Sequence, residues 1–476
     1  MLRKLIPQIL VLPLCFYFNS NKALLSETKD NIEEILQEKE DQIFINYSEI
    51  KNIISENNQE LKSLENLVKS STFNLSSKIA KNYPSIDLQL NGLPKYVAGK
   101  NYNSNSLTTK TSQFSVNPSV NIRWDLMDPV RGSEIKIAKD NYEIAKNNYE
   151  IKRKDLIKEA KSRYHKLQKS YQDIKNKKLS LDLSITSLKD AQAKLDAGVG
   201  TKFEVLEADA QLSRDRQSLN EKKIQHQINK ISLMEILNIE GDLTIKKEQE
   251  LIGFWNYKLN KNINEGLVKN LSLKNINLQK SIKQNQANSY RNANKPSIYI
   301  SNTFTSSFTK GDSLSVDINP EESGSSYTNT ISLNFAWNIF NGGQNNNLYK
   351  SSKSDAKSEE YSYNNLEGVL KTNISKAYLN LKLNEEKILS SLNEISSTDE
   401  SLRLARLRYD VGISTLKDVL IRQKELSNAN SKNIDAIYNY NLNLDELERL
   451  TFLEISNNCN KNDSDLKNEL KSICNI

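Results

Sequence analysis

Apolar residues recur at every seventh position in the second half of two long stretches of the chain, residues 130–195 and 344–409. In the second stretch these positions are Ile374, Leu381, Ile388, Ile395, Leu402 and Tyr409, and in the first they are Ala160, Leu167, Ile174, Leu181, Leu188 and Leu195. Neither stretch contains proline. Each therefore predicts a helix on the order of 100 Å long, at a rise of about 1.5 Å per residue. Sevenfold spacing is typical of coiled coils, so the stripes indicate packing seams.

A glycine ends each long helix and a threonine begins the next one. Gly198 and Gly412 suit the conformation that closes a helix, and Thr201 and Thr415 suit the N-cap of the following helix. The predicted returning helices cover residues 202–238 and 416–453. Two further helices are predicted over residues 47–81 and 263–294.

Alternation of apolar and polar residues predicts strands after these two further helices. The four strands cover about residues 84–93, 114–126, 296–308 and 328–340, and the hairpin loops, rich in Asn, Ser, Thr and Gly, cover about residues 94–113 and 309–327. In the second strand Val120, Ile122 and Trp124 alternate with Asn121 and Arg123. Strands of about ten residues with this pattern are typical of transmembrane barrels. A soluble sandwich alternates in the same way, but it does not account for two distant hairpins beside so much helix.

Four strands are too few to close a barrel, and an open sheet edge cannot face lipid because its amides would find no water. The barrel is therefore expected to be shared, and three chains would give twelve strands, an even number within the range of outer-membrane barrels. Trp124 and Trp337 lie near the strand ends that turn towards a helix. They are expected to form an aromatic belt at the membrane interface.

One structural unit is present twice. The turn at Gly198 recurs at Gly412 at a constant offset (412 − 198 = 214), and Tyr164 falls on Tyr378 at the same offset. The first repeat is expected over residues 45–250 and the second over residues 251–455. A duplicated unit means that an interpretation of one half must also explain the other.

Composition supports long solvated helices with narrow apolar seams. Charged residues make up 26% of the chain, while only 14 glycines and 8 prolines serve its 476 residues. The formal net charge of +7 comes from basic and acidic residues that are mixed along the helices. No basic block is interleaved with aromatic residues, so the charge indicates a solvated surface and not a nucleic-acid site.

The two ends of the chain differ in composition from the predicted repeats. Residues 1–23 resemble a signal peptide, with Arg3 and Lys4 before an apolar run. Cys15 in that run admits a second interpretation, a lipoprotein acylated at this thiol. Residues 24–44 are expected to be a flexible mature N-terminus. The polar C-terminal tail, residues 456–476, contains Cys459 and Cys474, which could form a disulfide in an oxidising compartment.

No motif for catalysis or for cofactor binding is present. The sequence contains no phosphate-binding glycine loop, no CxxC pair, no HExxH and no nucleophile triad. Its two histidines are His165 and His226, and the second lies on an apolar seam, which favours a packing role over metal binding. The chain is therefore expected not to be an enzyme and to bind no cofactor.

These features together resemble the TolC-like outer-membrane efflux protein family. The resemblance covers about residues 45–455 and rests on two motifs. One is the helix end Asn82-Tyr83-Pro84-Ser85-Ile86, and the other is the turn Arg408-Tyr409-Asp410-Val411-Gly412-Ile413-Ser414-Thr415 followed by Asp418-Val419-Leu420. The implied fold class is helical with transmembrane β: four strands and long coiled-coil helices per protomer. In a homotrimer these would form a shared 12-stranded barrel in the outer membrane and a helical barrel in the periplasm.

The resemblance also implies a function and partners. The protein would be a passive exit duct that contacts outer-membrane lipid, docks onto a periplasmic membrane-fusion adaptor and receives substrate from an inner-membrane transporter of RND, ABC or MFS type. Both efflux of small molecules and type I protein secretion fit this scheme. An alternative is a non-transporting structural coiled coil anchored in the outer membrane, but a mere anchor needs no polar strand face.

Particular residues acquire roles from the family pattern. Tyr409, Asp418 and Glu204 would form the periplasmic gate, with Asp418 repeated around the narrowest point. Ser414 and Ile421 depart from the pattern, because an arginine and a second aspartate are expected there, so the closed state would be held differently. The tip turns would dock the adaptor through the segments that contain Gly198, Thr201, Gly412 and Thr415.

Overall fold

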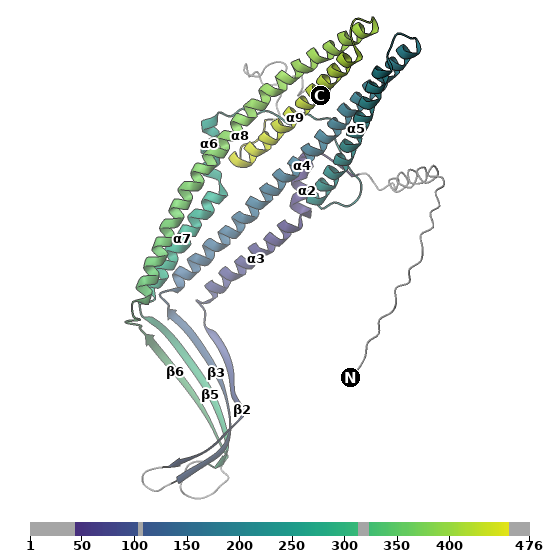
Figure 1. Cartoon of the computed structure of the whole chain (residues 1–476). Helices are drawn as coiled ribbons and strands as arrows, with labels where there is room; N and C mark the ends of the chain where they lie inside the picture. Colours follow the sequence, from purple (N-terminus) through teal and green to yellow (C-terminus); the bar gives the residue numbers. More distant parts are fainter. Residues whose placement is uncertain (1–42, 103–107, 313–322, 457–476) are drawn as a thin grey trace, which may run out of the picture.

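The computed structural model describes residues 43–102, 108–312 and 323–456. A four-stranded sheet lies at one end, and a long layer of helices runs from it to two hairpin tips at the other end (Figure 1). The expected signal peptide and the cysteines Cys459 and Cys474 lie outside the described residues. No helix in the described ranges is both long and apolar enough to cross a membrane.

The sheet has the strand order β2-β3-β5-β6, and all its neighbours are antiparallel. Its strands are β2 (Ser85–Tyr102), β3 (Thr108–Met127), β5 (Ser297–Asp312) and β6 (Ser323–Ala336). The strands are longer than predicted, and they include most of the residues expected in the hairpin loops. Backbone pairing continues through polar residues such as Lys100 and Thr109, where no alternation marks a strand. In contrast, β6 ends before Trp337, which the sequence placed inside the strand.

The described residues form eight α-helices and one 3-10 helix. They are α2 (Ile50–Asn57), α3 (Gln59–Ala80), α4 (Arg131–Asp196), α5 (Lys202–Leu237), α6 (Leu259–Lys269), α7 (Leu271–Asn292), α8 (Gln344–Asp410) and α9 (Leu416–Thr451), with the short 3-10 helix η1 (Tyr47–Glu49) before α2. The long helices and the returning helices agree closely with the predicted ranges.

The two other predicted helices are each broken at an asparagine. Asn58 separates α2 from α3, and its side chain accepts hydrogen bonds from the backbone N–H of Glu60 and Leu61 at 3.0 and 3.2 Å. Asn270 separates α6 from α7 and accepts from the N–H of Leu273 at 3.0 Å. Asparagine competes with the helix by capping the next one, so one predicted helix becomes two.

Helices follow the same lateral order as the strands. Near the sheet the neighbours are α3-α4-α7-α8, and near the tips they are α5-α4-α9-α8. Since α3 follows α5 along one side and α8 runs the full length of the other, the protomer has two lateral edges (Figure 1).

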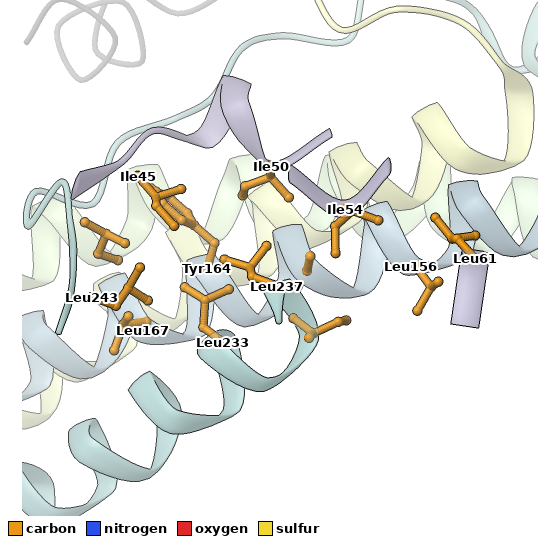
Figure 2. Close-up of a cluster of buried hydrophobic side chains, with 13 residues drawn as sticks. Ile45, Ile50, Ile54, Leu61, Leu156, Tyr164, Leu167, Leu233, Leu237 and Leu243 are labelled. Carbon is orange, nitrogen blue, oxygen red and sulfur yellow. The ribbon is translucent and has the colours of Figure 1, made fainter. Parts of the chain in front are cut away.

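A belt at mid-height joins the N-terminal segment to this layer. Strand β1 (Ile43–Ile45) pairs in parallel with β4 (Leu243–Ile245), so the last two residues of the expected flexible segment belong to a strand. Ile45, Ile50 and Ile54 pack with Tyr164 and Leu233 in a buried apolar cluster (Figure 2). This cluster fixes the path of the N-terminal segment against the middle of α4 and the end of α5.

Candidate functional site

The sheet presents an apolar face that none of the described residues covers. Its exposed residues include Ile86, Leu88 and Leu90 on β2, Ile122 and Trp124 on β3, Phe304 and Phe308 on β5, and Ile331, Leu333 and Phe335 on β6. Cross-strand pairs such as Ile86 with Ile122 bring apolar side chains together on this face. The predicted alternation is therefore present, and its apolar side is free to contact lipid.

The opposite face is polar and its side chains bond to one another. Asn334 donates from Nδ2 to the hydroxyl of Ser301 at 2.9 Å, and Ser307 donates to the side-chain oxygen of Asn117 at 2.6 Å. The guanidinium of Arg123 lies 3.7 Å from the ring centroid of Tyr299. Such a surface suits contact with water and not with hydrocarbon.

Both predicted interface tryptophans also anchor the joint between strands and helices. The indole N–H of Trp124 donates to the backbone carbonyl of Asn82 at 3.0 Å, and that of Trp337 donates to the carbonyl of Asn294 at 2.9 Å. Asn82 and Asn294 follow the ends of α3 and α7. Each tryptophan thus binds a backbone carbonyl two residues beyond a helix end.

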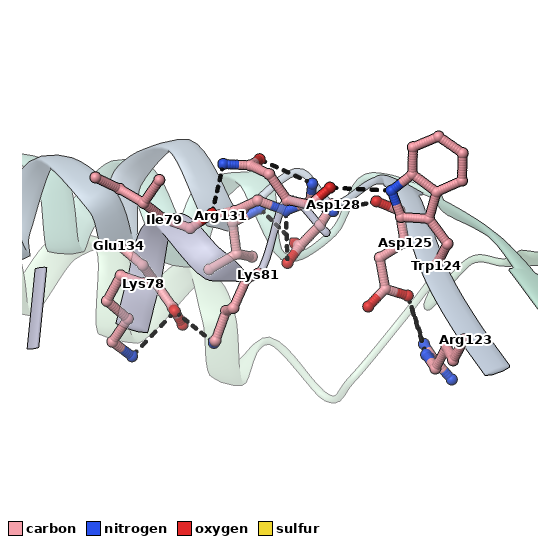
Figure 3. A network of polar contacts seen from close by, with 11 residues as sticks. Lys78, Ile79, Lys81, Arg123, Trp124, Asp125, Asp128, Arg131 and Glu134 are labelled. Atoms are coloured by element: carbon pink, nitrogen blue, oxygen red, sulfur yellow. Dashed lines mark hydrogen bonds and ion pairs between the residues drawn. The ribbon is translucent and has the colours of Figure 1, made fainter. Parts of the chain in front are cut away.

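The joint of the first repeat is reinforced by charges (Figure 3). Lys78 and Lys81 both bind the carboxylate of Glu134, at 3.2 and 2.8 Å. These lysines, Lys81 first, hold the pKa of Glu134 below its ordinary value. Arg131 donates to the side-chain oxygen of Asn82 at 3.1 Å. These contacts fix the start of α4 against the end of α3, so the sheet and the helices meet at a defined angle.

At the far end, both tip turns follow one design. Gly198 and Gly412 have φ values of +76° and +78°, in the left-handed region that only glycine enters at little cost. Thr201 accepts a hydrogen bond from the N–H of Glu204 at 3.2 Å, and Glu204 bonds back to the Thr201 N–H at 3.3 Å. Such a reciprocal capping box fixes the start of the returning helix.

The second tip has the same box with an added bond. Thr415 and Asp418 cap α9 reciprocally, at 3.4 and 3.3 Å. The hydroxyl of Ser414 also donates to the Asp418 carboxylate, at 2.8 Å. Ser414 therefore has a local role where the family pattern has an arginine. These hydrogen bonds, the one from Ser414 first, lower the pKa of Asp418, whose side chain is otherwise exposed.

Tyr409 is buried between the two tips. Its side chain is 4% exposed, and the ammonium of Lys194 lies 3.5 Å from its ring centroid. Lys194 also donates to the backbone carbonyl of Tyr409. Burial raises the pKa of Tyr409 to about 12, and carboxylates such as that of Glu204 add to this. The phenol is un-ionised at neutral pH, and its hydroxyl has no hydrogen-bond partner in the described part of the chain.

Lys194 is the tip residue that the sequence analysis missed. The repeat offset would have drawn attention to it, because Lys194 corresponds to Arg408 (408 − 214 = 194) beside Tyr409. It ties the first repeat to the second, and its contacts lie within the same apolar cluster as Leu402 and Val419.

A second tie between the repeats lies at mid-height. The buried carboxylate of Asp445 on α9 accepts the hydroxyl of Tyr47 at 2.5 Å and lies 3.2 Å from Nε2 of His165 on α4. His226 bonds through Nδ1 to the hydroxyl of Ser170 at 2.8 Å. Both histidines thus have packing partners, and the described residues contain no cluster of three or more metal-ligating side chains.

A hollow-duct subunit is the class that this geometry defines: a sheet with one apolar and one polar face, open at both edges, continued by a layer of helices. The model of the family described as outer membrane efflux protein matches residues 52–238 and 262–451, and the chain therefore belongs to that family. It is an outer-membrane efflux channel subunit with a periplasmic helical portion.

Solved structures of outer-membrane proteins and channels share this fold. The CmeC channel of Campylobacter jejuni superposes with a TM-score of 0.70 at 16% identity, covering 93% of this chain and 94% of that one. The VceC protein of Vibrio cholerae gives 0.70 at 12% identity over 85% and 96% of the two chains. The open state of the MtrE channel of Neisseria gonorrhoeae gives 0.62 at 15% identity over 85% and 88%. A search of curated protein sequences gives no significant match.

Proposed function

We propose that the chain is the passive exit duct of a tripartite system, in which three copies carry substrate from an inner-membrane transporter through the periplasm to the exterior. The observation that carries this proposal is the sheet, which is apolar on one face, hydrogen-bonded and polar on the other, and unpartnered at β2 and β6. Three such sheets would close into a barrel with a wet lumen. A structural anchor would have no use for that lumen.

The tip turns are the proposed contact with a membrane-fusion adaptor. They lie farthest from the sheet (Figure 1), and they expose apolar side chains, Val199 at 78% and Ile413 at 71%. Exposed apolar residues at the end of a rigid hairpin favour a protein partner. An inner-membrane transporter of RND, ABC or MFS type would supply the energy for transport.

The proposed gate lies next to these turns, on the side that faces the sheet. Tyr409 fixes the two hairpins of one protomer against each other, while Asp418 exposes a carboxylate that a threefold axis would repeat. Glu204 holds the corresponding place in the first repeat. A ring of carboxylates at a constriction would favour cations.

Conductance of the purified protein in a planar bilayer tests the duct. We expect ionic current without nucleotide or any other energy source. A protein that is trimeric and inserted but passes no current would refute the duct and favour the structural coiled coil.

Crosslinking in cells tests adaptor docking at the tip turns. Gly198→Val with Gly412→Val should reduce adaptor crosslinking and export together, because valine resists the left-handed conformation. Unchanged crosslinking in this folded double variant would remove the turns from the docking surface. Gly368 lies on α8 away from the turns, without a left-handed backbone and with open space around it, so Gly368→Val is the matched control and should leave docking intact.

A further inference from the structure

A pocket at mid-height lies where α2, α4 and the end of α9 meet. Its volume is about 220 Å³, and its apolar walls are Ile157, Phe452 and Leu453. Six cationic side chains line it, Lys51, Arg153, Lys154, Lys158, Lys161 and Arg449, against the three carboxylates of Asp445, Glu448 and Glu454. The pocket therefore has an excess of positive charge (6 − 3 = 3), whereas the whole chain has 66 basic and 59 acidic residues.

Four of the six cations are bound to carboxylates, and two are not. Lys161 lies 2.6 Å from Glu448 and 3.3 Å from Asp445. Arg153, Lys158 and Arg449 bind carboxylates that do not line the pocket, those of Glu150, Glu446 and Asp155, at 2.8, 2.7 and 2.7 Å. Lys51 and Lys154 have no ion pair within the described part of the chain. Their charges are the ones that the pocket leaves without a counter-charge.

The ring of Phe452 holds Lys154 in the pocket. The ammonium of Lys154 lies 3.8 Å from the ring centroid. Burial lowers the pKa of Lys154, and the positive charges of Arg449, Arg153 and Lys51 lower it further. A partly buried cation among other cations is unfavourable unless an anion offsets the charge.

Phe452 adopts a backbone conformation that an aromatic residue rarely occupies. It is the C-cap of α9, with φ 59° and ψ 21° in the left-handed region. Its counterpart in the first repeat is Asn238 (452 − 214 = 238), the C-cap of α5, with φ 52° and ψ 53°. Asparagine enters this region far more readily than a bulky residue. The second repeat thus has the less favourable residue where the ring lines the pocket, which indicates a function for the ring.

The five cations on α4 and α9 have no cationic counterpart in the other repeat. Residues 153, 154, 158, 161 and 449 correspond to Glu367, Gly368, Thr372, Ser375 and Glu235 (153 + 214, 154 + 214, 158 + 214, 161 + 214 and 449 − 214). Packing of a helix and contact with water make the same demands on both repeats. They do not explain a cationic cluster that only one repeat has.

We propose that this pocket is a binding site for one oxyanion, a phosphate or carboxylate group held by Lys51 and Lys154, with Phe452 as the residue that positions Lys154. Oxygens of both groups accept short, charge-assisted hydrogen bonds from ammonium groups. The bound group would join the N-terminal segment, through Lys51 on α2, to the middle of α4. The site goes beyond the proposed duct and does not depend on it.

Such a group is available from two sources, a free anion of the periplasm or a carboxylate of the chain itself. Residues 27–41 contain seven acidic and two basic residues. They lie outside the described residues, and β1 begins two residues later, at Ile43. The chemistry of the site is the same for both sources, so a binding experiment has to distinguish them.

Calorimetric titration of the purified full-length protein with inorganic phosphate, at neutral pH and constant ionic strength, tests the site. We expect saturable binding that weakens at least about tenfold in Lys51→Met with Lys154→Met, the effect expected when a hydrogen bond to a charged group is lost. Lys146→Met with Lys189→Met makes the same change in net charge at two exposed positions of α4. This control should bind phosphate within about twofold of the unaltered protein.

Phe452→Asn separates a role in binding from a role in folding. Asparagine is the residue of the first repeat and fits the left-handed backbone, so the Tm without phosphate should not fall. Binding of phosphate should weaken several-fold, because Lys154 loses the ring that positions it. A lower Tm with unchanged affinity for phosphate would show that the ring only packs, and it would overturn the positioning role.

A variant without carboxylates in residues 27–41 distinguishes the two sources. Its substitutions are Glu27→Gln, Asp30→Asn, Glu33→Gln, Glu34→Gln, Glu38→Gln, Glu40→Gln and Asp41→Asn. An affinity for phosphate that rises at least tenfold would identify this segment as the occupant, and an unchanged affinity would identify a free anion. The site would be overturned if neither this variant nor the unaltered protein bound phosphate saturably. Equal binding by Lys51→Met with Lys154→Met and by its control would overturn it as well.

Discussion

Lys194 and Tyr409 belong to different repeats, and their contact is what holds the two hairpin tips of a protomer together. The cation lies over the ring and also binds the tyrosine carbonyl, so one side chain secures both the ring and the backbone. The ring of Tyr409 lies in a buried apolar cluster with Leu402 and Val419. A change in how the tips are arranged must break the contact between Lys194 and Tyr409.

We predict that Lys194→Met loosens the tip. Methionine keeps the length of the side chain but removes the cation–π contact, worth about 0.5–1 kcal/mol, and the bond to the Tyr409 carbonyl. The resting conductance of the reconstituted protein should rise by a few-fold. Lys189→Met, at an exposed position of the same helix, is the control and should leave it unchanged. Equal conductance of Lys194→Met and the unaltered protein would show that this contact does not restrain the tip.

The second prediction concerns the charge of Asp418. Hydrogen bonds from Ser414 and Thr415 lower its pKa from the ordinary value of 3.8, so the carboxylate stays ionised in solutions that would protonate a free aspartate. Its contribution to the capping box is likewise complete at neutral pH and is lost only as the pH falls through this lowered pKa.

Block of the current by a trivalent cation, added from the periplasmic side, should therefore persist from pH 7 down to about pH 4 and should disappear in Asp418→Asn. Glu204→Gln should weaken the block by a smaller factor, because Glu204 holds the related place in the first repeat. Planar-bilayer conductance measures both. Undiminished block in Asp418→Asn would place the constriction elsewhere.

At the scale of elements, local signals were sufficient wherever one residue sets its own conformation. Gly198 and Gly412 close their helices, and Thr201 and Thr415 cap the next ones, as the sequence indicates. The predicted strand ends were wrong because the ladder of backbone hydrogen bonds continues through polar residues on both sides of a hairpin. Alternation marks only the part of a strand whose two faces meet different surroundings.

Contacts between elements carried weaker sequence signals. The helix breaks at Asn58 and Asn270 were missed because each asparagine lies within a continuous helical pattern of apolar residues. The meeting of His165 with Asp445 depends on how α4 lies against α9, which no spacing within one helix specifies. The same holds for Lys194 and Tyr409.

The two faces of β6 give a prediction for this element. Leu333 is 71% exposed on the apolar face, while Asn334 bonds to Ser301 on the polar face. Leu333→Asp would place a carboxylate in hydrocarbon, at a cost of a few kcal/mol that falls towards the interface. Asn334→Asp keeps an acceptor that a serine hydroxyl can turn to meet.

We expect Leu333→Asp to reduce the amount of trimer in the outer membrane by at least tenfold and Asn334→Asp to leave it within about twofold. Quantitative blotting of membrane fractions, heated and unheated, makes the measurement. Similar yields from the two variants would mean that β6 is inverted or does not face lipid.

At the scale of the whole molecule, the strands and the helices share one lateral order, so each protomer has the form of one segment of a barrel wall. Strand β2 continues from α3 on one edge, and β6 leads into α8 on the other. Among the described residues, no further strand pairs with β2 or β6 at the two edges of the sheet. In lipid such an edge is costly, and pairing with the next protomer removes the cost.

The last prediction is that the sheet is stable only in the assembled ring. A monomer kept dilute in detergent should retain its long helices, which have their own buried seams, including those around Tyr164 and Leu381. Its strands should lose their protection from hydrogen exchange. Four strands with an open edge on each side and an uncovered apolar face make too few contacts to remain folded. Amide hydrogen exchange read by mass spectrometry separates the two parts, with the central helices α4 and α9 as the internal control. In the trimer, β2 and β6 should exchange at least a hundredfold more slowly than in the monomer, while the middle of α4 changes little. A monomer whose edge strands are as protected as those of the trimer would show that the sheet needs no neighbour.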